Sequence, residues 1–169
     1  MNLIRNNLIL GLSITMEKAH SLGNKDITPF LNFIKVAWCN NQQDLYEWIL
    51  NWIAHTIQKP LVKMTTALVL RGEEGVGKGM VVQKLIQILG KHYCCQPTNA
   101  NDLLGNFNSI VDRKMLLFID ELVWGGDKQR AGILKKLISE ENGSINEKGI
   151  PQRTFVNNYN IIMASNEEW

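Results

Sequence analysis

Residues 66–79 read TALVLRGEEGVGKG, and this stretch decides how the rest of the chain folds. Residues 66–70 are an apolar run with the length and composition of a buried β-strand. The segment Gly72-Glu73-Glu74-Gly75-Val76-Gly77-Lys78-Gly79 follows and matches the spacing G-x-x-x-x-G-K. Residues 78–90 then repeat apolar positions at helical spacing up to Gly90. A strand, a glycine-rich turn ending in lysine and a helix together predict a phosphate-binding loop, or P-loop.

The residue types in this loop suit phosphate binding. Glycines at 75 and 77 let backbone N–H groups turn inward around phosphate oxygens, the following helix adds its positive end, and Lys78 can reach the β- and γ-phosphates. The alternative is a glycine turn with an incidental lysine, which the flanking strand and helix disfavour. The expected nucleotide-binding residues are Gly72, Glu73, Glu74, Gly75, Val76, Gly77, Lys78, Gly79 and Met80.

Magnesium must be held without the usual hydroxyl of such a loop. Gly79 stands where a serine or threonine normally follows the lysine, so the metal must rely on water and on an acidic residue elsewhere. Residues 114–121, KMLLFIDE, predict a second buried strand that ends in two carboxylates. We expect Asp120 to bind Mg²⁺ and Glu121 to polarise an attacking water as general base.

A third predicted strand, NYNIIMASN at 158–166, ends in Ser165-Asn166. The Asn166 amide can hydrogen-bond the γ-phosphate or the attacking water, a sensor role; it can equally cap a following helix, and both can hold at once. A helix beginning near Asp127 and a polar hairpin over 142–156 lie between the second and third strands. Strands that alternate with helices predict an α/β fold with a parallel sheet.

The region before the P-loop is expected to be helical. Thr28 is a good N-cap with Pro29 at the first helical position, and Pro60 should close a second helix, so residues 28–62 predict a small helical subdomain. Residues 1–27 predict a linker or leading helix, because they lack the cleavage site of a secretory signal. The apolar stripe of the second helix, expected to be packing surface, is Leu45, Trp48, Ile49, Trp52, Ile53 and Ile57.

Composition places the chain among soluble globular proteins. Its 169 residues suit one domain, and 45% hydrophobic with 20% charged residues exclude disordered and fibrous classes. A formal charge of +2 means that nucleic-acid contact needs a local basic patch. Three cysteines without metal-ligand spacing, and no run long enough to cross a membrane, predict a reducing, cytoplasmic location.

The series GEEGVGKG, LLFIDE and IIMASN, with NGSINEKG (142–149) between the last two, resembles the superfamily 3 helicases, most of all the primase-helicases of phages, plasmids and large DNA viruses. The resemblance runs from about Phe30 to Trp169. It implies an additional-strand, AAA+-like P-loop NTPase core over 63–169, with the third predicted strand lying between the first two.

The same resemblance implies the ATPase core of a replicative DNA helicase, which couples hydrolysis of ATP with Mg²⁺ to translocation on single-stranded DNA. Lys78 would contact phosphates, Asp120 magnesium, Glu121 water, Asn166 the γ-phosphate and Lys148 the DNA. The family works as hexameric rings, and a primase or polymerase domain upstream is a further implied partner. The six basic and three acidic side chains between 128 and 153 agree with DNA contact, although a solvated helix face and an ordinary hairpin would look alike.

Two other functions stay open. One is a P-loop ATPase that remodels proteins or loads them on DNA, and the other is a nucleotide-binding module without catalysis. The family's arginine finger follows the sensor strand, and the chain ends three residues after Asn166. We therefore expect the core to be truncated at its C-terminal end, and this chain alone to bind nucleotide but hydrolyse it slowly or not at all.

Overall fold

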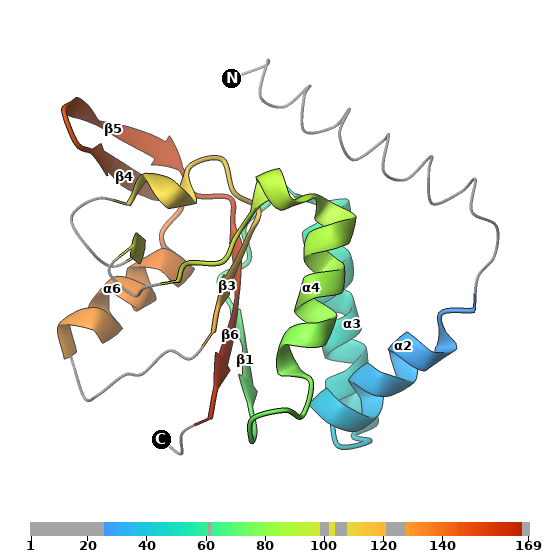
Figure 1. Ribbon diagram of the computed structural model, residues 1–169. Coiled ribbons are helices and arrows are strands. Elements are labelled where there is room, and N and C mark those ends of the chain that lie inside the picture. The colour runs from blue at the N-terminus through green and yellow to red at the C-terminus, as the bar shows by residue number, and fades with distance from the viewer. Residues whose placement is uncertain (1–25, 61, 99–101, 104–107, 121–127, 167–169) are drawn as a thin grey trace.

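The computed structural model describes residues 26–60, 62–98, 102–103, 108–120 and 128–166 (Figure 1). Its helices are α2 (Thr28–Phe33), a π-helix (Ile34–Trp38), α3 (Gln43–Gln58), α4 (Lys78–Leu89), the 3₁₀ turns η2 (Lys91–Tyr93) and η3 (Ser109–Val111), and α6 (Lys128–Ser139). Its strands are β1 (Ala67–Arg71), β2 (Cys94–Cys95), β3 (Leu116–Ile119), β4 (Asn142–Glu147), β5 (Ile150–Val156) and β6 (Asn160–Ser165).

The central sheet is parallel and has the order β1-β6-β3-β2. Strand β6 therefore lies between β1 and β3, as the resemblance implied. Leu68 of β1 pairs with Ile162 of β6, which also pairs with Phe118 of β3. All residues of β3 and β6 are buried, which explains why both strands read as continuous apolar runs in the sequence.

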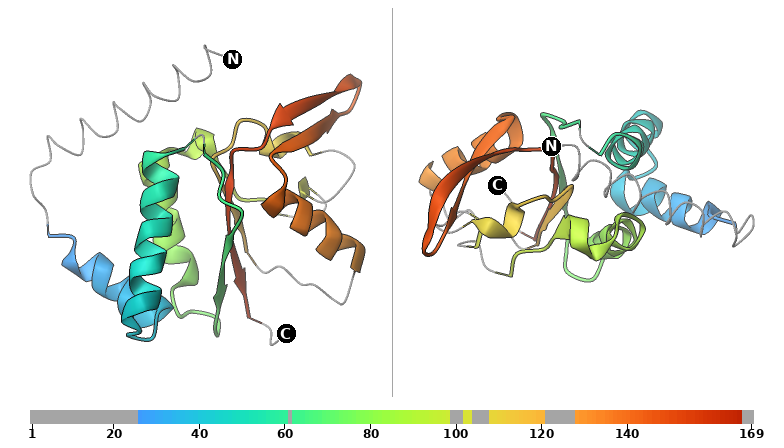
Figure 2. Two further views of the ribbon diagram at one scale, coloured as in Figure 1. Left: turned by 180° about the vertical axis from the view of Figure 1, so that it is seen from behind. Right: turned by 90° about the horizontal axis from the view of Figure 1, so that it is seen from above.

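Helices cover both faces of this sheet (Figures 1 and 2). The α2, π, α3 and α4 helices pack against one face, where Leu68, Phe118 and Ile162 share a core with Trp52 and Val81. Helix α6 covers the other face. There the core consists mainly of Leu117, Ile119, Leu134, Tyr159, Ile161 and Met163. The two sets alternate along the strands because successive side chains point to opposite faces.

The N-terminal helices contribute to this core. The N-cap of α2 lies one residue earlier than the sequence predicted. Ile27 is the N-cap of α2, so the prediction of Thr28 as N-cap is wrong; the Asp26 carboxylate instead accepts a hydrogen bond from the Thr28 N–H at 2.9 Å. The turn after Phe33 widens into a π-helix, which the sequence pattern did not predict.

The tryptophan stripe is only partly buried. Trp52 of α3 is 3% exposed, but Trp48 is 47% exposed and Leu45 is 38% exposed. The expectation that the whole stripe is packing surface is therefore wrong for its first turn, which faces a hollow described below. Helix α3 ends at Gln58, two residues before Pro60.

The predicted hairpin over 142–156 is confirmed as β4 and β5, which pair in antiparallel register. It rises from the end of the sheet where β3 and β6 begin (Figure 1). Asn108 fixes its base: the Asn108 side chain donates to the carbonyl of Ser144 at 2.9 Å and accepts from the Asn146 N–H at 3.0 Å. An ion pair of 2.6 Å joins Arg153 of β5 to Asp112.

Candidate nucleotide site at the carboxyl edge of the sheet

The glycine-rich loop joins β1 to α4 at the carboxyl edge of the sheet. Gly75 and Gly77 each have φ of +85°, the left-handed region that L side chains rarely adopt. A Cβ atom on Gly77 would lie 2.6 Å from Cζ of Phe33, so this loop also packs directly under α2. Phe33 was not predicted from the sequence, because its link to position 77 exists only in the folded chain.

The Lys78 ammonium lies at the centre of the loop. Its Nζ donates to the carbonyls of Gly72 and Glu73, the latter at 2.8 Å, and to the side-chain Oδ1 of Asn166 at 2.6 Å. The three donors of a lysine ammonium are thus all engaged. Lys78 and Asn166 are far apart in sequence, yet the fold brings the two predicted site residues into direct contact.

Backbone pairing explains this contact. Arg71 of β1 pairs with Ser165 of β6, and the N–H of Gly72 donates to the carbonyl of Ser165 at 3.3 Å. The loop therefore leaves β1 at the same level where β6 ends, directly before Asn166. In an open parallel sheet, ligands bind outside the carboxyl ends of strands whose connections lead to opposite faces. Strand β1 leads into α4 on one face, and the helix that follows β3 in the chain, α6, covers the other face, so the carboxyl edge around β1, β6 and β3 is such a place.

Asp120 also lies at this edge. It follows Ile119, which pairs with Met163 of β6, and its side chain is exposed. Among the described residues no three His, Cys, Asp or Glu side chains form a group that could hold a metal ion, so Asp120 belongs to no such group there. The predicted general base, Glu121, lies outside the described residues.

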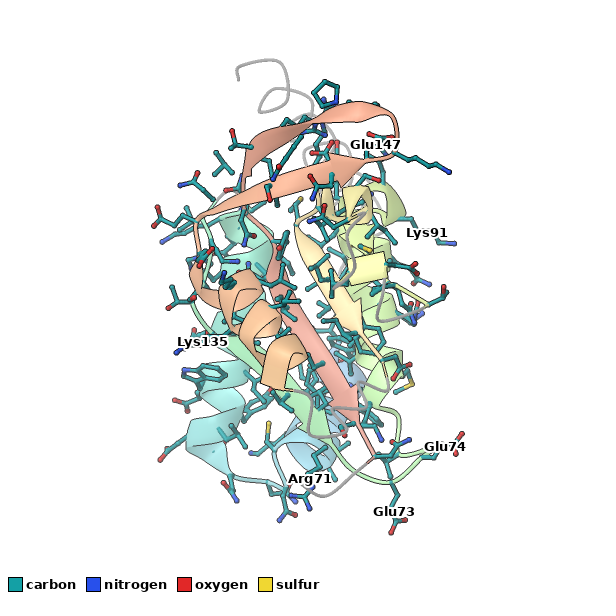
Figure 3. All side chains as sticks on the ribbon, turned by 90° about the vertical axis from the view of Figure 1, so that its left-hand side faces the viewer. Arg71, Glu73, Glu74, Lys91, Lys135 and Glu147 are labelled. Carbon is teal, nitrogen blue, oxygen red and sulfur yellow. The ribbon has the colours of Figure 1, made fainter. Side chains whose placement is uncertain are left out.

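The other predicted nucleotide-binding residues lie in the same loop or at the start of α4. Glu73 and Glu74 are exposed and point away from the body of the molecule (Figure 3). Val76 and Met80 are 46% and 49% exposed. A Cβ atom added to Gly79, the second residue of α4, would meet nothing within 4 Å, so the missing hydroxyl is not excluded by crowding.

A hollow of about 180 Å³ with both polar and apolar lining, the β1 groove, opens beside the lysine. It is lined by Ala37, Trp38, Leu45, Trp48, Ile49, residues 67–71, Val76 and Lys78. The indole N–H of Trp38 is buried and has no hydrogen-bond partner among the described residues. The sequence did not predict this groove, because the apolar stripe of α3 was expected to be packing surface.

Lys148, the predicted DNA-binding residue, is remote from this edge. It occupies the exposed turn between β4 and β5, next to Gly149 with φ of +80°. In Figure 3 its neighbour Glu147 marks the upper end of the molecule, while Arg71, Glu73 and Glu74 mark the lower end. The predicted phosphate contact and the predicted DNA contact therefore lie at opposite ends of the sheet.

No helix in the described part of the chain is long and apolar enough to span a membrane.

Comparison with known proteins identifies the family to which this fold and site belong. Residues 70–168, more than half of the chain, match the family described as a family of unknown function (DUF5906), and the chain belongs to that family. The matched region begins in β1 and includes the loop, Asp120 and Asn166.

One characterised relative is a protein named DNA Primase-polymerase from Nitratiruptor phage NrS-1. It is 31% identical over 121 residues, which cover 70% of this chain and 17% of the relative. Three apo structures of the NrS-1 C-terminal region share the fold, with TM-scores of 0.70, 0.73 and 0.71 at 22–23% identity. They match 85–86% of this chain, which spans 34–35% of each of them.

Proposed function

We propose that this chain is the ATPase core of a replicative DNA helicase of the superfamily 3 type, acting in phage DNA replication. The observation that carries the proposal is the contact of Lys78 with both the glycine-rich loop and Asn166. A nucleotide phosphate entering the loop would replace the carbonyl acceptors of the ammonium, and Asn166 would then lie beside the terminal phosphate.

The strand order and the groove add support. With β6 between β1 and β3, the sheet has the order of the additional-strand P-loop type, and Asp120 lies at the same edge for Mg²⁺. The β1 groove offers apolar walls and the exposed indole of Trp48 for a purine base, with Lys78 at one end for the phosphates. Glu121 would activate water for hydrolysis.

Lys148 would contact the backbone of single-stranded DNA at the far end of the sheet. Strands β3 and β6 run from the hairpin base to the nucleotide edge, so a shift at one end can be transmitted along two buried strands. Rings of six subunits and a primase or polymerase domain on the same polypeptide complete the proposal. The name of the phage relative supports the replication context.

Gly79 favours a second candidate, a nucleotide-binding module without catalysis, because it leaves Mg²⁺ one ligand short. A protein-remodelling ATPase is the third candidate.

For a helicase core, we expect ATP hydrolysis by the parent chain to be slow and to rise when oligo(dT) is added.

The discriminating experiment measures ATP hydrolysis with and without oligo(dT) for the parent, Lys148→Ala and, as control in the same turn, Glu147→Gln. The helicase proposal predicts DNA stimulation that Lys148→Ala abolishes and Glu147→Gln retains. Stimulation that survives Lys148→Ala favours remodelling and contradicts the helicase proposal. ATP binding without any hydrolysis, with or without oligo(dT), favours the non-catalytic module for this chain.

A further inference from the structure

A second and larger hollow, of about 520 Å³, lies at the opposite end of the sheet from Lys78. One wall is the edge strand β2 with its flanking residues, and the other is η3 with the segment before β3. The lining residues are His92, Cys94, Cys95, Gln96, Ser109, Ile110, Asp112, Arg113 and Lys114. We call this hollow the β2 groove.

The β2 groove is basic. Arg113 and Lys114 line it, and the only carboxylate among its lining residues, Asp112, is already paired with Arg153 at 2.6 Å. Arg113 approaches the same carboxylate no closer than 3.7 Å and keeps 61% of its side chain exposed. The cationic groups therefore outnumber the available negative charge, which favours an anionic ligand.

Arg113 is held in an unusual conformation. Its φ is +56°, the left-handed region, which is uncommon for a residue that is not glycine. The neighbouring Lys114 is fixed by a 2.7 Å hydrogen bond from its Nζ to the carbonyl of His92, which joins the two walls of the groove. Strained backbone in an otherwise regular fold tends to mark places where side-chain direction matters for function.

The two thiols on the floor of the groove are neutral. Burial raises the pKa of the Cys94 thiol to about 12 and also raises the pKa of the Cys95 thiol, so both stay neutral at physiological pH. With Ile110 they offer an apolar surface on which a sugar or base can lie. A ligand with both a phosphate and an apolar part fits this lining.

The groove is physically joined to the hairpin. Asp112 at its rim is paired with Arg153 of β5, and Asn108, just before η3, is hydrogen-bonded to Ser144 and Asn146 of β4. Lys91, adjacent to the lining residue His92, extends into solvent at the same end of the molecule as the hairpin turn (Figure 3). A single strand bound along the hairpin would therefore meet the basic residues of this groove at the hairpin base.

We propose that the β2 groove is a second nucleic-acid contact, in which Arg113 and Lys114 bind phosphodiester groups of the single strand that the hairpin engages. This inference rests on the proposed DNA-binding role and deepens it. It adds a contact outside the hairpin, on the segment that leads into β3.

The test measures binding of a fluorescent oligo(dT) by anisotropy over a series of salt concentrations. Each phosphate contact adds about 0.7 to the slope of log K against log salt for single strands. We expect Arg113→Gln to weaken binding about three- to tenfold at low salt and to lower the slope by about 0.7. The matched control is Lys84→Gln, which removes one positive charge from an exposed position of α4 and should change neither value.

Photocrosslinking gives a readout that does not depend on a mutation. An oligonucleotide carrying 4-thiothymidine should crosslink to peptides containing residues 91–96 or 109–114 as well as to the hairpin. If Arg113→Gln leaves the slope unchanged and crosslinks are confined to 142–156, the proposed contact in the β2 groove is overturned and the hairpin contact remains. Absence of oligonucleotide binding by the parent overturns both, while binding of ATP at the other end of the sheet is measured separately.

Discussion

Gly79→Ser supplies the hydroxyl that the glycine-rich loop lacks, and its effect on the proposed nucleotide site can be worked out from the structure. A Cβ atom at this position meets no atom within 4 Å, and Gly79 is not among the glycines with positive φ. The side chain should therefore enter open space at the second position of α4. Replacing a helical glycine should by itself stabilise the fold by up to about 0.5 kcal/mol.

The larger effect is expected on magnesium. A hydroxyl at position 79 can add one ligand to the metal of a bound Mg-ATP, and we take its net value as that of one polar contact, about 0.5–1.5 kcal/mol. Because 1.36 kcal/mol is a factor of ten, Gly79→Ser should bind Mg-ATP about two- to tenfold more tightly than the parent. Binding of ATP in EDTA should not change.

Calorimetry of the parent, Gly79→Ser and Gly79→Ala separates the two contributions. Gly79→Ala supplies the Cβ without the hydroxyl, so it should share the gain in stability but not the gain in magnesium affinity. If Gly79→Ser binds Mg-ATP no better than Gly79→Ala, the hydroxyl does not reach the metal and the reasoning about this loop is wrong.

Three further outcomes are expected. Gly77→Ala should lower the unfolding free energy by about 2 kcal/mol in urea titrations, because the new Cβ atom would sit on a left-handed backbone and 2.6 Å from Phe33. Gly75→Ala should lower it less, because its Cβ atom would meet no other atom within 4 Å. Trp48→Ala should weaken ATP binding about fivefold by removing a stacking surface worth about 1 kcal/mol, while binding of inorganic tripolyphosphate, which has no base, stays the same. Stability in reducing buffer should fall as pH rises from 9 toward 12, because the Cys94 thiol keeps its proton in the fold and loses it on unfolding. Cys94→Ala should lessen this fall without abolishing it, because burial also raises the pKa of the Cys95 thiol and of the Tyr159 hydroxyl. Lys63, whose pKa burial lowers to about 8, acts in the opposite direction.

The strand, glycine-rich loop and helix at the carboxyl edge of the sheet were predicted well because their signals are local. A strand, a glycine-rich turn and a helix that follow one another can be recognised without knowing the rest of the fold, and β1, the loop and α4 are found where the pattern indicated. The strands at β3 and β6 were equally clear, because buried parallel strands are apolar on both faces. The position of β6 between them required the family resemblance.

Features that depend on distant contacts could not be read from the pattern. Strand β2 has two residues, too few for any periodicity, and it is defined by pairing of Cys94 and Cys95 with β3. The packing of Phe33 on Gly77 and the joining of Asp112 to Arg153 exist only after folding. Trp48 was misread because periodicity shows which face of a helix is apolar but not whether another element covers it.

The most direct test of the central claim, that the carboxyl edge of the sheet is an ATP site, is calorimetry of Mg-ATP binding to the parent, Lys78→Ala and Lys84→Ala. Lys84 is an exposed lysine of the same helix, so it controls for the loss of one charge. Charged hydrogen bonds contribute about 1.5–3 kcal/mol. We expect Lys78→Ala to lose at least about tenfold in affinity while Lys84→Ala binds like the parent. Equal affinity of the parent and Lys78→Ala would contradict it.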